Sequence, residues 1–331
     1  MRVHASAPTR IDLGGGTLDI WPLYLFHDDV QTLNAAITIR AECRLSATPG
    51  RSLRIVAQDT DASTTVDHWS ELDDQPALRL PARILRFFRA SGLTIETRSA
   101  APVGAGLAGS SALNIALCAA LARWQERRLE PEELMALALN LEAQAIGVPT
   151  GAQDYRPAVY GGVAAVELGP AGVSRTPLAV DPAALDERIV LVYTGQSRDS
   201  GINNWEVTKR RIDGDRTLTS LLDEIRDATL GLRHALDNAD WTVVARYVAL
   251  EWDLRKRLAP GVTTDRLEAL IRCGRNAGAD AAKVCGAGGG GCILFLAEPD
   301  AVGPVRRALA AAGGRVLDCQ VDTEGLRVTA H

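Results

Sequence analysis

The N-terminal part of the chain begins with hydrophobic positions in the spacing of strands. Apolar residues at every second position from 37 to 45 alternate with threonine, arginine and glutamate, which predicts a strand with one solvent-facing side. A turn sequence at 48–50 is followed by renewed alternation at 53–57, so the two strands are expected to form a hairpin. The acidic and polar residues at 58–76 are typical of a surface loop.

Longer apolar stretches with helical spacing follow. A helix is expected at 81–90, with a proline in its first turn, and a strand at 93–99. The segment 110–127 is apolar nearly all round, which predicts a helix that is mostly buried. A second helix is expected at 131–146 and a further strand at 161–168.

The second half is richer in helices. It begins with a strand at 188–195, and leucines at helical spacing then mark a long amphipathic helix around 218–236. Further elements are expected in the order helix 240–258, helix 263–277, strand 281–285, strand 292–298, helix 301–312 and two closing strands. Long helices beside few antiparallel strands predict an α+β fold, with a domain boundary before the strand at 188–195.

Composition excludes several classes of protein. Hydrophobic residues make up 47% of the 331 residues and charged residues 23%, which is typical of a soluble globular protein, and no apolar run is long enough to span a bilayer. The formal net charge of −5 and the scattered arginines disfavour nucleic acid or an anionic membrane as the main partner.

The N-terminal residues lack the apolar core of a signal peptide. The six cysteines form no Cys-x-x-Cys pair and the five histidines are dispersed, so we expect buried, reduced thiols in a cytoplasmic protein without a zinc site.

Glycine-rich segments occur three times, at 14–17, 104–109 and 286–291, each after an expected strand. One such segment is often only a tight turn. Three of them are harder to explain in that way, because glycine lets the backbone approach a ligand closely and direct successive N–H groups at it.

The segment 104–109 has the spacing Gly-x-Gly-x-x-Gly, which also occurs in dinucleotide-binding turns. Such a turn needs an acidic residue at the end of a strand about 20 residues later, but that region is still expected to be helical, and no Lys-Ser or Lys-Thr follows the glycines as in a Walker A loop. A phosphate cradle at a helix N-terminus remains, with Ser110 and Ser111 placed either to contact Mg²⁺ and phosphates or simply to cap the helix.

Two carboxylates and two residues that flank the first glycine segment are candidates for the chemistry. Glu142, on a helix, and Asp154, after a Pro-Thr-Gly turn, could serve as a metal ligand and as a base, or form a surface salt bridge and a turn cap. Arg10 lies nine residues before Asp19, which is placed to accept hydrogen bonds from sugar hydroxyls. Trp21 is expected in the core, although it could also wall a sugar pocket.

These segments together resemble the GHMP kinase superfamily over nearly the whole chain. "PVGAGLAGSSA" is similar to the family's ATP-phosphate loop, "KVCGAGGGGCILF" to its third motif, "GVPTGAQD" to the segment with the catalytic aspartate and "APTRIDLGGGTLD" to its first motif. Within the superfamily, sugar kinases of the D-glycero-D-manno-heptose 7-phosphate kinase type are the most similar, through "LNAAI", "GAQDYRPAVYGG", "YTGQSRDS" and "EWDLRKRLAPGV".

The resemblance implies a role for each matching position. Asp154 would be the base, Arg10 would stabilise charge on the moving phosphoryl group, and Ser110 and Glu142 would hold Mg²⁺. The triphosphate of ATP would lie against Pro102, Gly104, Ala105, Gly106, Leu107, Ala108, Gly109, Ser110 and Ser111. The substrate would lie against Gly16, Thr17, Asp19, Gln153, Tyr193, Gly195, Gly286, Gly288 and Gly289.

The resemblance also implies a two-domain fold, and the sequence departs from the family pattern at two positions. Residues 1–186 would form an ATP-binding catalytic domain like domain 2 of ribosomal protein S5, and residues 187–331 a ferredoxin-like domain. The family loop has serine where Gly109 stands. The heptose kinases have threonine directly before the sugar-binding aspartate, where Leu18 stands here, so that Thr17 is one place early.

The sequence therefore predicts an ATP- and Mg²⁺-dependent kinase that phosphorylates a hydroxyl of a small-molecule sugar or sugar phosphate, with D-glycero-D-manno-heptose 7-phosphate as the expected substrate. A phosphorylated substrate needs a second basic cluster, for which the candidates are Arg198, Lys209, Arg255 and Lys256. Alternatives are a kinase of free fucose or galactose, a non-catalytic sugar- or nucleotide-binding protein on the same fold, and an NAD-dependent oxidoreductase. The oligomeric state stays open, a homodimer included.

Overall fold

The computed structural model describes residues 1–73, 75–196 and 201–331 and contains two sheets in these residues. The first sheet has the order β12-β1-β2-β5-β3-β4, and β6 and β7 extend it from β2. Its strands are β1 (Arg2–Gly14), β2 (Val30–Ala47), β3 (Leu53–Ala57), β4 (Ala62–Val66), β5 (Leu93–Ser99), β6 (Val163–Gly169), β7 (Gly172–Pro177) and β12 (Arg327–Ala330). All neighbours are antiparallel except β3 and β5, which run parallel.

The second sheet is antiparallel and has the order β11-β8-β10-β9 within the described residues. Its strands are β8 (Ile189–Tyr193), β9 (Ala279–Val284), β10 (Cys292–Ala297) and β11 (Arg315–Leu317). After β11 the chain returns to the first sheet, where β12 pairs with β1. The division of the chain into domains at 186/187 stays a prediction.

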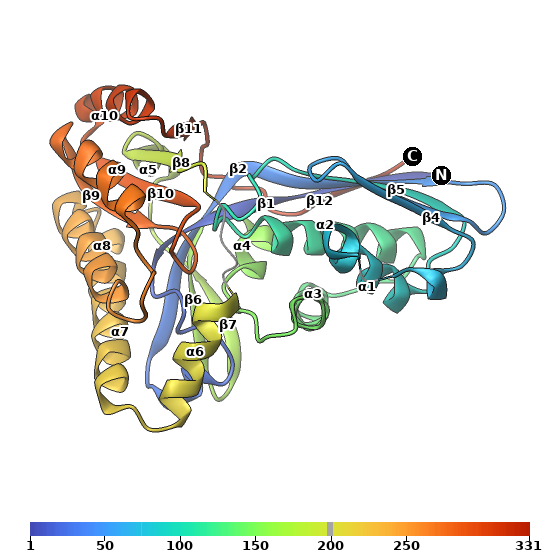
Figure 1. Ribbon diagram of the computed structural model, residues 1–331, viewed down its shortest axis with the longest axis horizontal. Coiled ribbons are helices and arrows are strands. Elements are labelled where there is room, and N and C mark those ends of the chain that lie inside the picture. Colours follow the sequence, from blue (N-terminus) through green and yellow to red (C-terminus); the bar gives the residue numbers. More distant parts are fainter. Residues whose placement is uncertain (74, 197–200) are drawn as a thin grey trace.

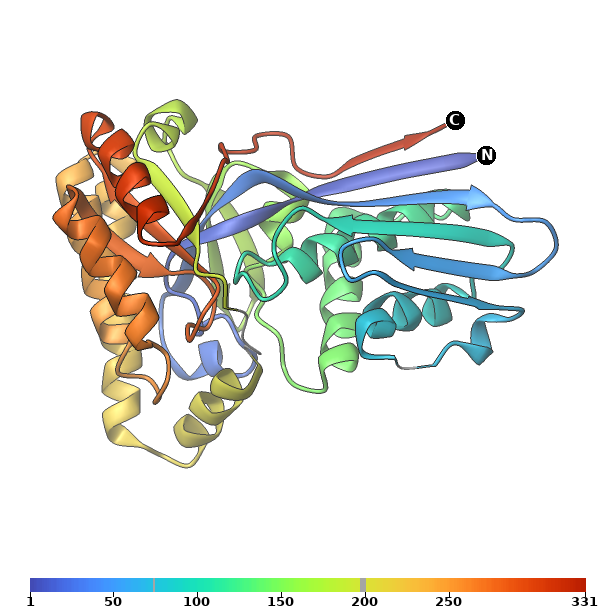
Figure 2. The same cartoon turned by 45° about the horizontal axis from the view of Figure 1, so that its top comes forward.

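The helices lie in two groups. Helices α1 (Arg79–Phe88), α2 (Gly109–Trp124) and α3 (Pro131–Ile146) cover one face of the first sheet, as Figure 1 shows. The remaining helices are α4 (Tyr155–Tyr160), α5 (Pro182–Asp186), α6 (Gly201–Ile212), α7 (Arg216–Asp237), α8 (Trp241–Arg255), α9 (Asp265–Asn276) and α10 (Pro299–Ala311). Helices α7 to α10 gather at the end of the molecule that holds the second sheet (Figures 1 and 2).

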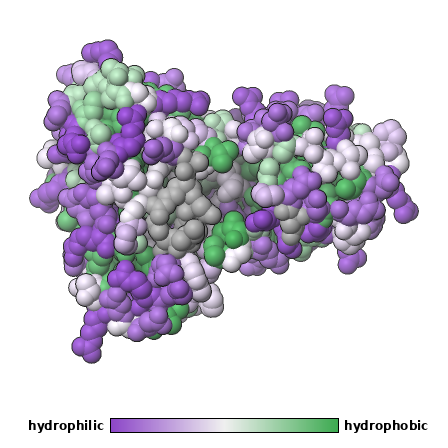
Figure 3. Space-filling view, in the orientation of Figure 1, coloured by the Kyte–Doolittle hydropathy of each residue, from purple (hydrophilic) through white to green (hydrophobic). Residues whose placement is uncertain are grey.

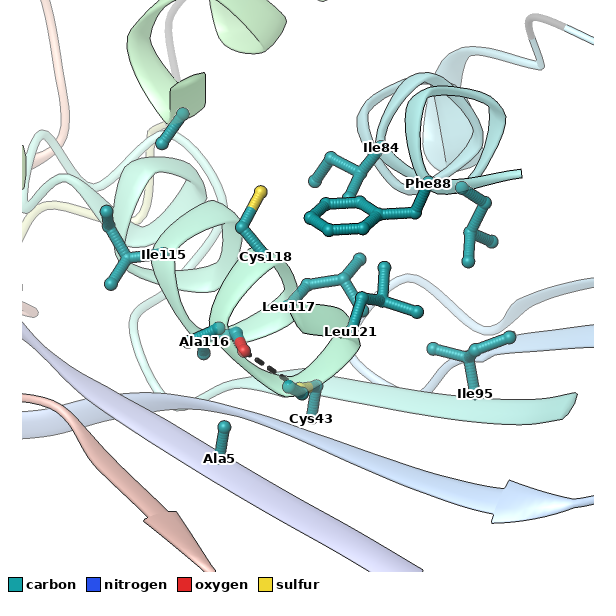
Figure 4. Close-up of a cluster of buried hydrophobic side chains, with 14 of the residues drawn as sticks. Ala5, Cys43, Ile84, Phe88, Ile95, Ile115, Ala116, Leu117, Cys118 and Leu121 are labelled. Atoms are coloured by element: carbon teal, nitrogen blue, oxygen red, sulfur yellow. Dashed lines mark hydrogen bonds between the residues drawn. The ribbon is translucent and has the colours of Figure 1, made fainter. Parts of the chain in front are cut away.

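Helix α2 is buried on nearly every side, as its sequence predicts. It packs on β1 and β2 with one side and on α1 and α3 with others, so only a helix without a polar face fits there. Figure 4 shows Leu117 and Leu121 of α2 between Phe88 of α1 and Cys43 of β2, whose thiol donates to the Ala116 carbonyl. This packing holds the N-terminus of α2, and the glycine loop before it, in a fixed position.

Two expectations for 37–76 are wrong. The strands at 37–45 and 53–57 do not form a hairpin, because β5 lies between β2 and β3. The expected loop 58–76 contains β4, an edge strand whose residues are exposed or half-buried, so it lacks the apolar alternation that would have indicated a strand. The strand β7 and the helices α4, α5 and α6 were not predicted.

The hydrophobic core is continuous between the sheets. Ile11 and Leu33 of the first sheet pack in one cluster with Leu191 and Leu294 of the second sheet and with Leu232 of α7. Four cysteines are buried, as expected, whereas Cys273 and Cys319 are only half-buried. On the face seen in Figure 3, hydrophilic residues dominate and apolar residues gather in small groups. In the described residues, no helix combines the length and the apolar character needed to cross a membrane.

Candidate active site

A cavity of about 480 Å³ lies where the glycine segments meet. This volume is in the range of sites that bind small molecules. The wall includes the loop 101–111, the start of the turn before α4, part of the first glycine segment and two residues of the third. Segments that are far apart in the sequence thus build one site.

The loop before α2 has the backbone that its glycines predict. Gly104 and Gly106 have φ values of +68° and +75°, in the left-handed region that favours glycine. The first intrahelical bond of α2 runs from the Ala112 N–H to the Ala108 carbonyl, which leaves the N–H groups of residues 109–111 without helical partners. Such a helix N-terminus at a cavity attracts anions.

The third glycine segment packs directly on this loop. A Cβ atom on Gly106 would lie 2.3 Å from the carbonyl oxygen of Cys285, and one on Gly286 would lie 2.9 Å from the Gly106 Cα. The Cys292 N–H donates to the Ala105 carbonyl at 2.8 Å. Neither backbone leaves room for a side chain, so the two glycine segments pack backbone against backbone.

Arg10 and Asp154 form an ion pair at this loop. The Arg10 side chain on β1 donates from Nε to Asp154 Oδ1 at 2.9 Å and from Nη1 to the Gly106 carbonyl at 2.8 Å. Burial alone would lower the pKa of Arg10, but the carboxylates of Asp154 and Asp12 outweigh it and raise the pKa. Arg10 therefore stays charged and connects the loop to a carboxylate in the cavity wall.

Glu142 contacts the first turn of α2. Ser110 Oγ donates to Glu142 Oε1 at 2.6 Å, and the Tyr155 hydroxyl donates to Oε2 at 2.7 Å. Burial raises the pKa of Glu142 against the effect of both hydrogen bonds. A buried carboxylate beside a hydroxyl is an oxygen donor pair of the kind that Mg²⁺ prefers, so these residues fit a bound magnesium ion.

Among the described residues, no group of three or more His, Cys, Asp or Glu side chains could hold a metal ion. Mg²⁺ usually binds one or two carboxylates together with substrate phosphates and water rather than an all-protein cage. A single carboxylate at an anion-binding helix end agrees with that mode.

Asp19 lies two residues after the first glycine segment. Its Oδ2 accepts from the Gln153 N–H at 3.1 Å and its Oδ1 from Gln153 Nε2 at 3.3 Å. A Cβ on Gly151 would lie 2.0 Å from Asp19 Oδ2, so this contact requires glycine. Burial, assisted by the charge of Asp154, raises the pKa of Asp19 to about 6.

A buried group of charges lies behind the first glycine segment. Arg255 Nη1 is 2.9 Å from Asp12 Oδ2, and Lys283 Nζ is 3.1 Å from Asp12 Oδ1 and 3.2 Å from Glu251 Oε2. None of the four side chains is more than 2% exposed. Of these four residues, only Arg255 lines the cavity. It is also the one that the sequence analysis named, as a candidate for binding a substrate phosphate.

Most of the predicted site residues line the cavity. They are Arg10, Thr17, Asp19, Pro102, Gly104, Ala105, Gly106, Leu107, Ala108, Gly109, Ser110, Ser111, Glu142, Gln153, Asp154 and Gly286. Five others do not line it in the described part of the chain: Gly16, Tyr193, Gly195, Gly288 and Gly289. A Cβ on Gly16 would meet Arg255, and one on Gly288 would meet the Val262 carbonyl at 2.4 Å, so these glycines serve packing.

The remaining candidates lie elsewhere. Lys209 pairs with Glu206 and Lys256 with Asp253, and neither lysine lines the cavity. Arg198 lies outside the described residues. Trp21, expected in the core, is 61% exposed.

Part of the cavity wall was not predicted from the sequence. It consists of Ala57, Asp59, Thr60, Pro76, Ala77, Leu80, Pro81 and Thr97. These residues come from β3, β5, α1 and the expected surface loop, and none of them carries a recognisable motif. Their place in the site depends on how β3 and β5 pair, which local patterns do not show.

Comparison with known proteins identifies the family. Residues 78–162 match the model of the GHMP kinases N terminal domain, and residues 232–315 match that of the GHMP kinases C terminal domain. The D-glycero-alpha-D-manno-heptose 7-phosphate kinase of Campylobacter jejuni is 28% identical, over 98% of each chain. A mevalonate kinase of Thermococcus onnurineus is 29% identical over 99% of this chain and 98% of its own.

Among solved structures, a D-glycero-D-manno-heptose 1-phosphate kinase from Bacteroides thetaiotaomicron superimposes with a TM-score of 0.79, at 25% identity and over 99% of each chain. The predicted fold is thereby confirmed over the length of the chain.

Proposed function

Because this chain belongs to the GHMP kinase family of phosphotransferases, we propose that it transfers the γ-phosphoryl group of ATP to a sugar phosphate. The proposed acceptor is the 1-hydroxyl of D-glycero-D-manno-heptose 7-phosphate, the substrate class named for the Campylobacter jejuni relative. One observation carries the proposal. The Arg10–Asp154 ion pair contacts the glycine loop at Gly106 and the first turn of α2 at Ser111, and it lines the same cavity as the buried carboxylate of Asp19.

Each residue of the site would then have its own role in phosphoryl transfer. The N–H groups of 109–111 would hold phosphate oxygens, and Arg10 would stabilise the charge that develops on the transferred group. Asp154 would accept the proton of the attacking hydroxyl, as the new O–P bond forms and the bond to the ADP oxygen breaks. Ser111 donates to Asp154 Oδ2 at 3.4 Å and so helps to orient this carboxylate.

Ser110 and Glu142 would hold the magnesium ion. When bound there, Mg²⁺ neutralises negative charge on the phosphate oxygens. Glu142 is held in place for this by Tyr155, which fixes the second carboxylate oxygen.

The cavity wall contains groups suited to both substrates. Ala57, Pro76, Leu80 and Pro81 offer apolar surface, as a nucleobase requires. Asp19 and Gln153 offer the hydrogen-bonding groups that a sugar requires.

A kinase of a free sugar is the second candidate, and one observation favours it. The basic side chains that line the cavity in the described residues, Arg10 and Arg255, are each paired with a carboxylate. A substrate phosphate would have to compete with these carboxylates for its partner.

An ADP-release assay separates the candidates. Heptose, mannose, fucose and galactose would each be offered free and with a terminal phosphate, together with Mg-ATP. Preference for the heptose 7-phosphate is expected, and equal turnover of free and phosphorylated heptose would contradict it. A melting-temperature shift with NADH but none with Mg-ATP would contradict kinase function altogether.

The base is tested by Asp154→Asn. This variant should fold and bind ATP but lose at least about a hundredfold in kcat, the usual lower contribution of a general base. Asp181→Asn is the matched control, because Asp181 also precedes a short helix but caps α5 away from the cavity. Near-normal turnover by Asp154→Asn would show that another group takes the proton.

A further inference from the structure

The loop that carries Asp19 is attached to helix α8 at two points. The Gly15 N–H donates to Glu251 Oε1 at 3.3 Å, and Arg255 Nη2 donates to Thr17 Oγ1 at 3.1 Å. Thr17 is only two residues from Asp19. Through these contacts α8, which belongs to the second half of the chain, determines where the loop lies relative to the cavity.

The guanidinium of Arg255 is already committed to the protein. Besides Thr17 it contacts two carboxylates, with Nη1 at 2.9 Å from Asp12 Oδ2 and 3.6 Å from Glu251 Oε1. A Cβ on Gly16 would lie 2.6 Å from Arg255 Nη2, so the backbone of the loop packs directly against the guanidinium. The side chain is 2% exposed even though it forms part of the cavity wall.

Thr17 has an unfavourable backbone conformation. Its φ is +79°, in the left-handed region that β-branched residues rarely adopt. Such a conformation persists where surrounding contacts hold it. A glycine would fit this backbone without strain, but glycine has no hydroxyl to accept from Arg255. The contact therefore explains why threonine occupies this position.

We propose that Arg255 is a positioning residue for the acceptor sugar, which acts on Asp19 through Thr17 and does not bind a phosphate group of the substrate. The role in sugar binding rests on the proposed kinase function. The role in holding the loop does not, because it follows from contacts within the protein.

The first measurement needs no substrate. Backbone amides of residues 14–20 would be followed by hydrogen–deuterium exchange in the full-length protein and in four variants. Thr17→Val keeps the shape but removes the acceptor, Thr17→Ser keeps the acceptor, and Arg255→Lys keeps the charge but not the planar fork of donors. Arg257→Met is the matched control, because Arg257 follows α8 but pairs on the surface with Glu224.

Faster exchange in this loop is expected for Thr17→Val and Arg255→Lys, and a much smaller change for Thr17→Ser and Arg257→Met. Unchanged exchange in both Thr17→Val and Arg255→Lys would overturn the positioning role. This result would be decisive whether or not the protein phosphorylates a sugar.

The second measurement is steady-state kinetics with heptose 7-phosphate and with free heptose. Thr17→Val and Arg255→Lys should each raise the KM for sugar about tenfold, the effect of losing one hydrogen bond to a charged group. The KM for ATP should change by less than about twofold, since the contact from Arg255 to Thr17 involves no residue of the phosphate cradle. The double variant should be little worse than the worse single variant, because both changes break one contact.

The kinetic outcomes distinguish the two hypotheses. If Arg255→Lys raises the KM for heptose 7-phosphate but not for heptose, Arg255 binds the phosphate and the proposal is wrong. Additive effects in the double variant would equally reject action through Thr17. If the unaltered enzyme phosphorylates neither sugar, the proposed function fails, and the exchange experiment alone decides the positioning role.

Discussion

The hydrogen bond from Tyr155 to Glu142 offers a direct test of the magnesium assignment. Tyr155→Phe removes one of the two donors that stabilise the ionised carboxylate, and leaves Ser110 in place. Burial already raises the pKa of Glu142, and both hydrogen bonds oppose that effect, so the variant should raise the pKa further. A cation requires the deprotonated carboxylate, so protons should compete more strongly with Mg²⁺.

The size of the effect follows from the hydrogen bond. A hydrogen bond to an ionised acceptor contributes about 1.5 kcal/mol or more, and each 1.4 kcal/mol is tenfold in an equilibrium. The half-saturating Mg²⁺ concentration should therefore rise by about tenfold in acidic solution. The difference should fade as the pH rises, because Glu142 ionises in both proteins once the pH exceeds its raised pKa.

The assay is ADP release as a function of free Mg²⁺, at about pH 6 and at about pH 8.5, on either side of neutrality. Tyr160→Phe is the matched control. Tyr160 lies at the other end of α4 and donates to Glu132, also on α3, at 3.3 Å, but on the surface. If the two variants show the same Mg²⁺ dependence at both pH values, Glu142 is not the carboxylate that binds the metal.

Three further outcomes are expected. Gly106→Ala should lower the free energy of unfolding by clearly more than Gly50→Ala in denaturant titrations: both glycines have positive φ, but only Gly106 faces a carbonyl 2.3 Å from the new Cβ. The kcat/KM for sugar should fall as the pH drops through about 6, where Asp19 gains a proton, and Asp19→Asn should lack this dependence. The same raised pKa means that the stability contributed by protonated Asp19 is lost as the pH rises from about 4 to about 6, so Asp19→Asn should gain stability relative to the unaltered protein over this range. Lys283→Met should destabilise the protein by about 3–5 kcal/mol in urea, because it leaves two buried carboxylates, Asp12 and Glu251, with Arg255 as their one remaining cation in the network, and adding Glu251→Gln should recover part of the loss.

The parts of the site that the sequence predicted depend on local chemistry. Gly104 and Gly106 were expected to adopt special backbone conformations between a strand and a helix, and they have positive φ there. Ser110 and Ser111 follow at the helix N-terminus, as the pattern indicated. A loop of this kind is determined largely by its own residues, so its shape is legible from a short stretch of sequence.

Contacts between segments were predicted only where the family resemblance supplied them. The ion pair between Arg10 and Asp154 joins residues 144 positions apart, and nothing in either local pattern relates them. Where the resemblance gave no guidance, the pairing of strands was wrong. Alternation at 37–45 and 53–57 indicates two strands but not their neighbours, and β5, from later in the chain, lies between them.

The buried ion network could not be predicted from any local sequence pattern. Charged residues are solvated by default, so Lys283, inside the strand "AAKVC", and Glu251, on a helix, carry no sign of burial. Each is buried only because Asp12 and Arg255 are brought to it from other elements, and each would be costly to bury without them. A hydrophobic core of the same shape would hold the two halves of the chain together equally well. It would lack, however, the hydrogen-bond donor that Arg255 directs at Thr17 in the loop that carries Asp19. The ion network is therefore better explained by the position that it imposes on this loop than by the stability it adds.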